Sequence, residues 1–355
     1  MKRILFIFLV LASTPISAVA QDSLDWLFIY YAPYDNNLSH YSDSILNQLE
    51  SVREFENIQV VLQVDKSDSV GMLRYAIGAN ATTIDTIASE ESTSRKSLQA
   101  YLRWASETYK FKQSAVFFLD HGGGLNEVGQ DLNPDSTFLT TRSIRKPLEK
   151  FNKWNQSKVD LIYLQVCAKS SIEPLYEFRD VSHYTLASQQ LLGAPNYYYS
   201  EVIRQASQNQ LTDGLELAKS IALNDREDMI SKLTCVDNSQ FDLIRSDFRK
   251  LTFLLEKKEQ LLFKKPPLQY EYANDRYWDL VDFLNCLDLQ SQSAIKLRDG
   301  LIESIENKLV AYTYTPVSSD FSGISIAALS KERIGAFWWK MQFYRDFRMN
   351  QLPIE

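Results

Sequence analysis

Cysteine, glycine and proline are scarce in this chain of 355 residues, which contains 3 Cys, 11 Gly and 10 Pro. So few cysteines exclude a disulfide framework, and the wide spacing of Cys167, Cys235 and Cys286 excludes a zinc cluster of the CxxC type. So few glycines and prolines exclude collagen-like repeats and linker-rich arrays. Hydrophobic residues make up 45% of the chain, which predicts a folded protein with a large core.

An excess of positive charge is also missing, because the formal net charge is -7. Proteins that bind duplex nucleic acids neutralise phosphates with a basic face, so we expect no nucleic-acid partner. Beyond residue 20 no apolar run reaches the roughly 20 residues that span a bilayer, so we expect no membrane span. We further expect a monomer that requires no cofactor.

The first twenty residues have the three parts of a secretory signal. Lys2 and Arg3 precede an apolar run over 4–12, and the segment ends in the small residues Ala18-Val19-Ala20. The alternative is a membrane anchor, but the apolar run is too short for one. We predict a signal peptide cleaved after Ala20 and an exported protein, periplasmic or extracellular. Cleavage removes two cations and no acid, so the formal charge becomes -9.

Short apolar runs alternate with amphipathic stretches up to about residue 190. Runs rich in Ile, Val, Phe and Tyr are typical of strands buried on both faces. They cover 26–32, 59–65, 115–121, 160–167 and 184–189. Residues 38–55 and 94–109 show helical spacing, with Ser94 as a candidate N-cap. The alternation predicts an α/β fold with a mainly parallel sheet that helices cover on both faces.

After about residue 205 the pattern is mainly helical. The predicted helices cover 211–223, 239–263, 276–287 and 290–308. Two late apolar runs, 309–315 and 323–329, are predicted to be strands that return to the sheet. We therefore divide the chain into a signal peptide (1–20), a core (21–205) and a mainly helical region that returns two strands to the sheet (206–355).

Two of the predicted strands end in reactive side chains. One runs into His121 and the glycines Gly122-Gly123-Gly124, and the other ends at Cys167. Because catalysis in parallel sheets lies at the carboxyl ends of the strands, the imidazole and the thiol fall on one edge. If the strands are neighbours, this is the arrangement of a cysteine nucleophile and its base. Taken singly, each residue also fits a purely structural role.

Attack by a thiolate on a carbonyl also requires donors for the oxyanion, and backbone N–H groups serve this purpose. The amides of Gly122 and Cys167 are the candidate donors. After the thiol, Ser170 to Pro174 is similar to a helix start and Lys169 adds positive charge. Both features favour the thiolate.

Several motifs occur in the order of a known family. They are Asp35-Asn36-Asn37-Leu38, Asp120-His121-Gly122-Gly123-Gly124, Asp160 to Cys167, Glu173, Ala187-Ser188, Cys235-Val236-Asp237, Tyr277 to Phe283 and Ser322 to Ile326. Over most of residues 25–345 the chain resembles the clostripain-type cysteine peptidases of the caspase-like clan, peptidase family C11. The resemblance implies a caspase-like three-layer sandwich with a helical C-terminal addition, in which 21–205 is the catalytic core.

The resemblance also implies roles for the reactive residues. Cys167 is then the nucleophile, His121 the general base and acid, and the amides of Gly122 and Cys167 the oxyanion hole. The partner is a peptide or protein substrate. Some relatives are helped by calcium, but the sequence has no EF-hand spacing and no metal ligands are assigned.

One departure from the family concerns specificity. Members that cleave after Arg or Lys carry an acid two positions before the nucleophile, and frequently acids after the next Ala-Ser. Here Gln165 occupies the first position, and Gln189 and Gln190 follow Ser188. A buried basic side chain without an anionic partner has a large desolvation cost. We therefore predict a polar, uncharged S1 pocket that involves these four residues, and no strict preference for Arg or Lys at P1.

Our leading hypothesis is an exported cysteine endopeptidase that uses a His121/Cys167 dyad and an acyl-enzyme. The alternative is a catalytically silent, peptide-binding relative of the same fold. A structural surface protein is a third reading, which the absence of repeats disfavours.

Overall fold

The computed structural model describes residues 23–351 except 68–70, 89–90, 134 and 256–260. The predicted signal peptide, residues 1–20, lies outside the described residues. Among the described residues, no helix is both long and apolar enough to cross a membrane.

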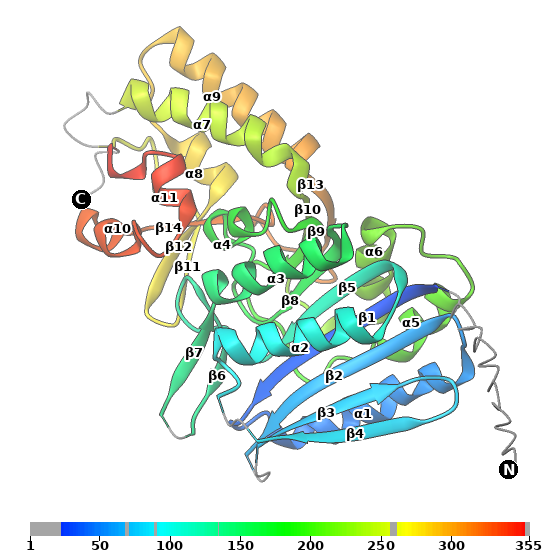
Figure 1. Cartoon of the computed structure of the whole chain (residues 1–355). Helices are drawn as coiled ribbons and strands as arrows, with labels where there is room; N and C mark the ends of the chain where they lie inside the picture. The colour runs from blue at the N-terminus through cyan, green and yellow to red at the C-terminus, as the bar shows by residue number, and fades with distance from the viewer. Residues whose placement is uncertain (1–22, 68–70, 89–90, 134, 256–260, 352–355) are drawn as a thin grey trace, which may run out of the picture.

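A nine-stranded sheet forms the centre of the molecule (Figure 1). Its strands are β1 (Leu24–Tyr34), β2 (Ile58–Lys66), β3 (Met72–Ile77), β4 (Thr82–Ile87), β5 (Phe111–Leu119), β8 (Val159–Gln165), β9 (Ser182–Ser188), β10 (Leu233–Asp237) and β13 (Val310–Tyr314). Their order is β13-β10-β9-β8-β5-β1-β2-β3-β4. The strands β9-β8-β5-β1-β2 run parallel, and the outer strands pair antiparallel. The predicted α/β fold with a mainly parallel sheet is confirmed.

Strand β1 explains why the sheet needs a helical layer on each face. Its successive side chains point to opposite faces. Leu27, Ile29 and Tyr31 belong to one hydrophobic cluster, whereas Trp26 and Phe28 belong to the other. All five are 1% exposed or less, so apolar side chains at every position are what the two buried faces require.

The helices fall into a layer on each side of the sheet and a C-terminal group. One layer packs against the first cluster and contains α2 (Arg95–Thr108), α3 (Thr141–Asn155) and α4 (Ile172–Glu177). The opposite layer contains α1 (Ser42–Leu49), α5 (Tyr199–Ser207) and α6 (Gly214–Asn224). The C-terminal group is α7 (Phe241–Leu255), α8 (Leu280–Cys286), α9 (Gln292–Ser304), α10 (Lys331–Phe337) and α11 (Gln342–Asp346). Helix α2 begins after Ser94, whose side chain accepts a hydrogen bond from the Lys96 amide, as the predicted N-cap requires.

The remaining elements are short. They are the strands β6 (Glu127–Asp131), β7 (Thr137–Thr140), β11 (Gln269–Tyr272), β12 (Asp275–Asp279) and β14 (Ser325–Ala327), the 3-10 turns η1 (Ser39–Tyr41), η2 (Glu50–Glu54), η3 (Glu227–Met229), η4 (Asn238–Gln240) and η6 (Met349–Gln351), and the π-helical turn η5 (Ile305–Leu309). Strands β6 and β7 form a hairpin, and β11-β12-β14 form a separate sheet.

Two predictions for the C-terminal region were wrong. Of the two late apolar runs, only 309–315 forms a strand of the central sheet, β13, because β14 pairs with β12; the period of an apolar run does not specify its partner strand. The second strand that this region contributes to the central sheet is β10. The predicted helix over 276–287 begins instead at Leu280, after β12. There Asp279 accepts a hydrogen bond from the Asp282 amide at 3.0 Å, so this side chain caps the helix and ends the strand.

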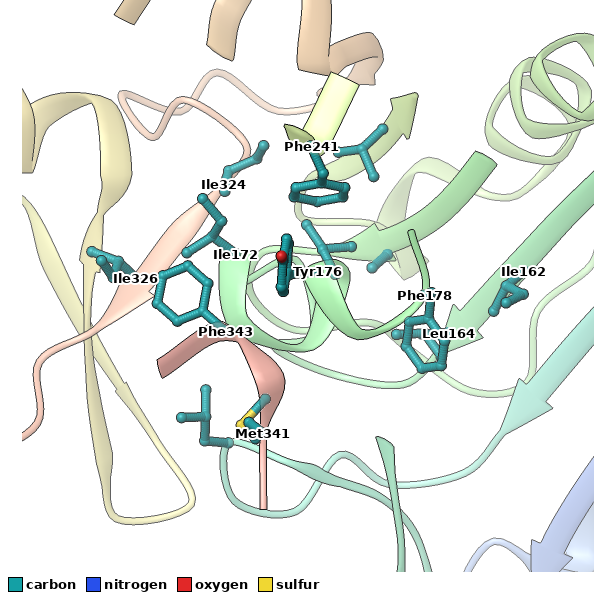
Figure 2. Packing of buried hydrophobic residues seen from close by; sticks show 14 of the residues in the cluster. Ile162, Leu164, Ile172, Tyr176, Phe178, Phe241, Ile324, Ile326, Met341 and Phe343 are labelled. Carbon is teal, nitrogen blue, oxygen red and sulfur yellow. The ribbon is translucent and has the colours of Figure 1, made fainter. Parts of the chain in front are cut away.

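The C-terminal helices share a core with the sheet (Figure 2). Tyr176 of α4 lies at the centre of this packing, between the sheet and the C-terminal elements. The cluster comes from segments far apart in sequence and includes Ile162, Leu164, Phe241, Ile324, Ile326, Met341 and Phe343. Since the predicted boundary at residue 205 cuts through this cluster, the region after it packs as part of the same core.

Candidate active site

The register of two neighbouring strands brings the predicted dyad to one edge of the sheet. Strand β5 pairs with β8 in parallel, and Leu119 lies opposite Gln165. His121 and Cys167 each follow two residues later. They therefore leave the sheet at the same level and on adjacent strands, at the carboxyl ends where parallel sheets place their chemistry.

Gly122 lies against the backbone of Cys167. A Cβ atom added to Gly122 would meet the Cys167 carbonyl oxygen at 2.1 Å and the Cys167 amide nitrogen at 3.2 Å. No side chain fits in this space, so glycine is required for the close approach. The contact brings the two amides predicted to form the oxyanion hole into one place.

The chain turns sharply after the thiol. Ala168 has φ 53°, in the left-handed region that favours glycine. The turn is held by the end of β9, because the amides of Ala168 and Lys169 donate to the carbonyl oxygens of Gln190 and Ser188 at 2.8 and 2.9 Å. Hydrogen bonds to the next strand thus maintain a strained residue beside Cys167.

The His121 ring has a polar partner from the segment after β1. Its Nε2 lies 2.7 Å from Oδ1 of Asn37. An amide oxygen only accepts, so this contact favours the tautomer in which Nε2 carries the proton and Nδ1 keeps its lone pair. Partial burial lowers the pKa of His121 below its ordinary value, which favours the neutral ring that a general base needs.

Asp120 fixes the backbone at the start of this loop. Its carboxylate accepts hydrogen bonds from the amides of His121 and Gln130, both at 2.6 Å, and from Nδ2 of Asn36 at 2.9 Å. Burial raises the pKa of Asp120 well above its ordinary value, and these hydrogen bonds oppose that shift. Asp120 and Asn36 therefore position the loop and do not face the thiol as acid or base.

The Cys167 thiol is partly exposed, whereas Cys235 and Cys286 are buried. Its sulfur accepts a hydrogen bond from the Leu192 amide at 3.3 Å and donates to the Leu192 carbonyl at 3.4 Å. A backbone N–H directed at the sulfur stabilises a thiolate. Of the described cysteines, Cys167 alone is accessible to a substrate.

Comparisons with known proteins show the family and the fold of this chain. The sequence model of the clostripain family matches residues 30–332. The chain belongs to the clostripain family. It is therefore a cysteine-type peptidase. The comparison with curated protein sequences found no match.

Solved structures share the fold of this clostripain-family chain. A secreted C11 cysteine protease from Bacteroides thetaiotaomicron, in complex with an irreversible peptide inhibitor, is 17% identical with a TM-score of 0.69, and the match covers 92% of this chain and 99% of that one. An inactive zymogen C11 protease from Parabacteroides distasonis is 16% identical with a TM-score of 0.67, and the match covers 92% of this chain and 98% of that one. At these identities the likeness establishes the fold.

Lys169 is a fully buried cation in the centre of this clostripain-family peptidase. Its Nζ donates to the Gly123 carbonyl oxygen at 3.0 Å. Burial lowers the pKa of Lys169 to about 8, while the charges of Cys167, Glu127 and Asp275 raise it. The amine is mostly protonated at neutral pH, so a buried positive charge lies close enough to act on the Cys167 sulfur.

A cleft of about 830 Å³, the Cys167 cleft, opens beside the nucleophile. It is lined by Cys167, Leu268 and the segments 190–193, 227–231 and 317–321. Three of the lining carboxylates are exposed, those of Glu227, Asp228 and Asp320. Asp228 is paired with Arg226. The cleft is thus open and acidic at its exposed positions.

Of the predicted substrate-binding residues, the structure brings only Gln190 to the Cys167 cleft. The Gln165 side chain is buried, donates to the Tyr199 hydroxyl at 2.9 Å and accepts from Tyr198 at 2.7 Å. Gln189 is buried and donates to Asp279 Oδ2 at 3.0 Å. Ser188 is also buried, and its hydroxyl donates to the Lys232 carbonyl oxygen at 3.1 Å.

Sequence reasoning missed Asn37 and the carboxylates of the cleft. The sequence contains a clue to the role of Asn37, because this residue follows the first strand of the sheet within a family motif. The sequence contains no clue to the carboxylates, because residues 227, 228 and 320 come together only in the folded chain. Among the described residues, no group of three or more His, Cys, Asp and Glu side chains is placed to hold a metal ion, so a calcium effect stays a prediction without a site.

Proposed function

We propose that the protein is an exported cysteine endopeptidase in which His121 and Cys167 form the catalytic dyad. The observation that carries the proposal is the shared level of the two residues on β5 and β8, together with the close approach of Gly122 to Cys167. The Asn37 contact supports it, because it leaves Nδ1 of His121 with a lone pair for the thiol proton.

The reaction then follows from these groups. The Cys167 thiolate attacks the peptide carbonyl and a C–S bond forms, while the amides of Gly122 and Cys167 hold the oxyanion. Collapse breaks the C–N bond, and His121 donates its proton to the leaving amine. Water, deprotonated by His121, attacks the acyl-enzyme and the C–S bond breaks. His121 returns the proton to sulfur, and the enzyme is regenerated.

For specificity we propose that Arg or Lys at P1 is accepted without being strictly required. Gln165 and Gln189 are occupied by buried hydrogen bonds, and the carboxylates that line the Cys167 cleft are exposed. Exposed ion pairs contribute about 0–1 kcal/mol, a preference of about fivefold at most. A strict preference needs a buried acid, which the described lining of the cleft does not supply.

The dyad is tested with Cys167→Ala and His121→Ala in the mature protein, using a peptide library. Each variant is expected to lose cleavage while keeping the wild-type melting temperature, and wild type is expected to be alkylated once, at Cys167. Cleavage that survives in Cys167→Ala contradicts the mechanism. Wild type that binds peptides without cleaving them supports the alternative, a catalytically silent binding relative.

Export is tested separately by N-terminal sequencing of the protein recovered outside the cytoplasm. Cleavage after Ala20 gives a mature chain that begins at Gln21. The description of the Bacteroides thetaiotaomicron relative as secreted supports this expectation. An intact N-terminus in the cytoplasmic fraction contradicts it.

A further inference from the structure

Tyr272 lies beside Cys167 but has no part in the mechanism above. It is the last residue of β11, opposite Asp275 in the β11–β12 hairpin. The two turn residues, Ala273 and Asn274, have φ 49° and 62°, and a two-residue type I′ turn requires positive φ at both positions. The tight turn thus fixes where the Tyr272 ring leaves the strand.

Hydrogen bonds attach this hairpin to the segments that follow both members of the dyad. Oδ2 of Asp275 accepts from the Leu125 amide at 2.9 Å. The Tyr270 hydroxyl and Oγ of Ser325 are 2.9 Å apart, and the Ser325 amide donates to the Ser170 carbonyl at 2.9 Å. The hairpin is therefore a rigid wall of the site, which is the support that a positioned donor needs.

The Tyr272 side chain contacts the reacting groups. The Lys169 ammonium lies 5.7 Å from the ring centroid. The hydroxyl lies beside the Cys167 side chain and the Gly122 amide, and both act on it. Burial, followed by the charge of Cys167, raises the pKa of Tyr272 above its ordinary value. The hydroxyl therefore keeps its proton at neutral and mildly alkaline pH.

We propose that Tyr272 is a further catalytic residue, whose hydroxyl donates a hydrogen bond to the Cys167 thiolate in the free enzyme and to the oxyanion during attack. The inference rests on the proposed dyad mechanism. As the C–S bond forms, negative charge moves from sulfur to the carbonyl oxygen, which takes over the Gly122 N–H. The phenolic O–H turns toward that oxygen. No bond to Tyr272 is made or broken, and its proton stays in place.

The Tyr272 hydroxyl thus stabilises two successive anions in the site, first the thiolate and then the oxyanion. Other charged groups also act here: Lys169 and the carboxyl group of Asp120 act on Tyr272, and the carboxyl groups of Glu127 and Asp275 act on Lys169. Tyr272→Phe leaves all of these unchanged and keeps the ring against Lys169. The substitution therefore isolates the hydroxyl.

The first experiment compares turnover by Tyr272→Phe with that of Tyr109→Phe, a control tyrosine that follows α2 and lies at the opposite end of β5 from His121. We expect kcat of Tyr272→Phe to fall by about 10- to 100-fold, with KM changed less than threefold, because an oxyanion donor acts on the transition state. Tyr109→Phe is expected to stay within twofold of wild type.

The second experiment measures alkylation of Cys167 by iodoacetamide at about pH 6.5 and about pH 10, which lie below and above the pKa of about 8.5 of a free cysteine in general. Loss of a donor to the thiolate is expected to slow labelling of Tyr272→Phe several-fold at the lower pH and to leave it unchanged at the higher one. A structural defect would change both rates together.

The outcomes separate this inference from the dyad mechanism. If Cys167→Ala still cleaves peptides, the dyad mechanism fails. If Cys167→Ala is inactive and Tyr272→Phe equals wild type in both experiments, only the role of Tyr272 is overturned. Faster turnover by Tyr272→Phe also overturns it, because the hydroxyl would then compete with the substrate for the Gly122 amide.

Discussion

On the reaction side of Cys167 the functional groups are buried or half-buried and hydrogen-bonded, whereas the Cys167 cleft is lined mainly by exposed and half-exposed loop residues. The reaction side holds the Gly122 amide, the His121 ring and the Lys169 ammonium, which adjacent strands and the β11–β12 hairpin position. The cleft carries exposed carboxylates such as Glu227 and Asp320. From this difference we expect a preorganised chemical step and a permissive choice of substrate.

The substitution Gly122→Ala is expected to reduce activity more than any other considered below. The added Cβ would lie 2.1 Å from the Cys167 carbonyl oxygen, so the two amides must move apart. We expect kcat/KM to fall by about 1,000-fold or more, in line with the loss of an oxyanion donor. Gly300→Ala is the control, because a Cβ there meets nothing within 4 Å; near-normal activity of Gly122→Ala would show that this close approach is unimportant.

Removal of the His121 partner should have the next largest effect. Asn37→Ala leaves Nε2 without its acceptor at 2.7 Å, so the ring samples unproductive tautomers and orientations. We expect kcat to fall by about 10- to 100-fold with little change in melting temperature, because Asn37 is exposed. Asn133→Ala removes a nearby amide that contacts Asp35 instead, and an equal loss of activity in that variant would contradict a specific role for Asn37.

The substitution Lys169→Met should lower the activity and raise the stability of the protein at pH 7. The folded-state pKa of Lys169, about 8, lies below its ordinary value of 10.5. The wild-type free energy of unfolding therefore rises with pH between these values, because the unfolded chain binds more protons there, by up to about 3 kcal/mol. The variant should lack this rise, be more stable at pH 7, and lose about tenfold in kcat/KM near pH 6.5 as the thiolate loses a neighbouring cation.

Denaturant unfolding between pH 7 and 10.5 measures the stability part of this prediction, and steady-state kinetics measures the other part. Lys146→Met is the control, since Lys146 is a surface residue that pairs with Glu149. A Lys169→Met variant that is less stable than wild type at pH 7 would show that the buried ammonium is a net stabilising group.

The smallest effects are expected in the Cys167 cleft. Glu227→Gln combined with Asp320→Asn should reduce kcat/KM for P1 Arg and Lys substrates by about fivefold at most, since exposed ion pairs are weak. Matched substrates with P1 Gln, Asn and Ala should change less than twofold and serve as the control. A loss of 100-fold for P1 Arg alone would mean that the carboxylates form a strict basic pocket.

Much of the fold could be predicted because both faces of the sheet are buried. Strand β1 is apolar at nearly every position, and the strands that end near His121 and Cys167 have the same pattern. Edge strand β4 was missed because its side chains are mostly exposed. The segment that forms strand β12 is predicted to be helical, because its Tyr-Trp pair fits the helical and the strand period equally well in a short window.

The candidate site was predictable only in part, for a related reason. His121, Gly122 and Cys167 follow strands that the sequence reveals, so their common edge could be inferred from topology. Gln165 precedes Cys167 and was expected in the substrate pocket, yet its side chain points into a buried network of Tyr198, Tyr199 and Asn196. The direction of a side chain at a strand end depends on neighbours that local sequence does not specify.

The sequence by itself determined the alternation of buried strands and helices, the order of the clostripain-family motifs and the strand ends at which His121 and Cys167 lie, because each depends on residues close together along the chain. Only the tertiary structure decided that Lys169 is a buried cation, that Tyr272 meets a thiol from a strand about a hundred residues earlier, and which carboxylates line the cleft. These properties depend on long-range packing, since burial and contact are fixed by residues that are distant in sequence and adjacent only after folding.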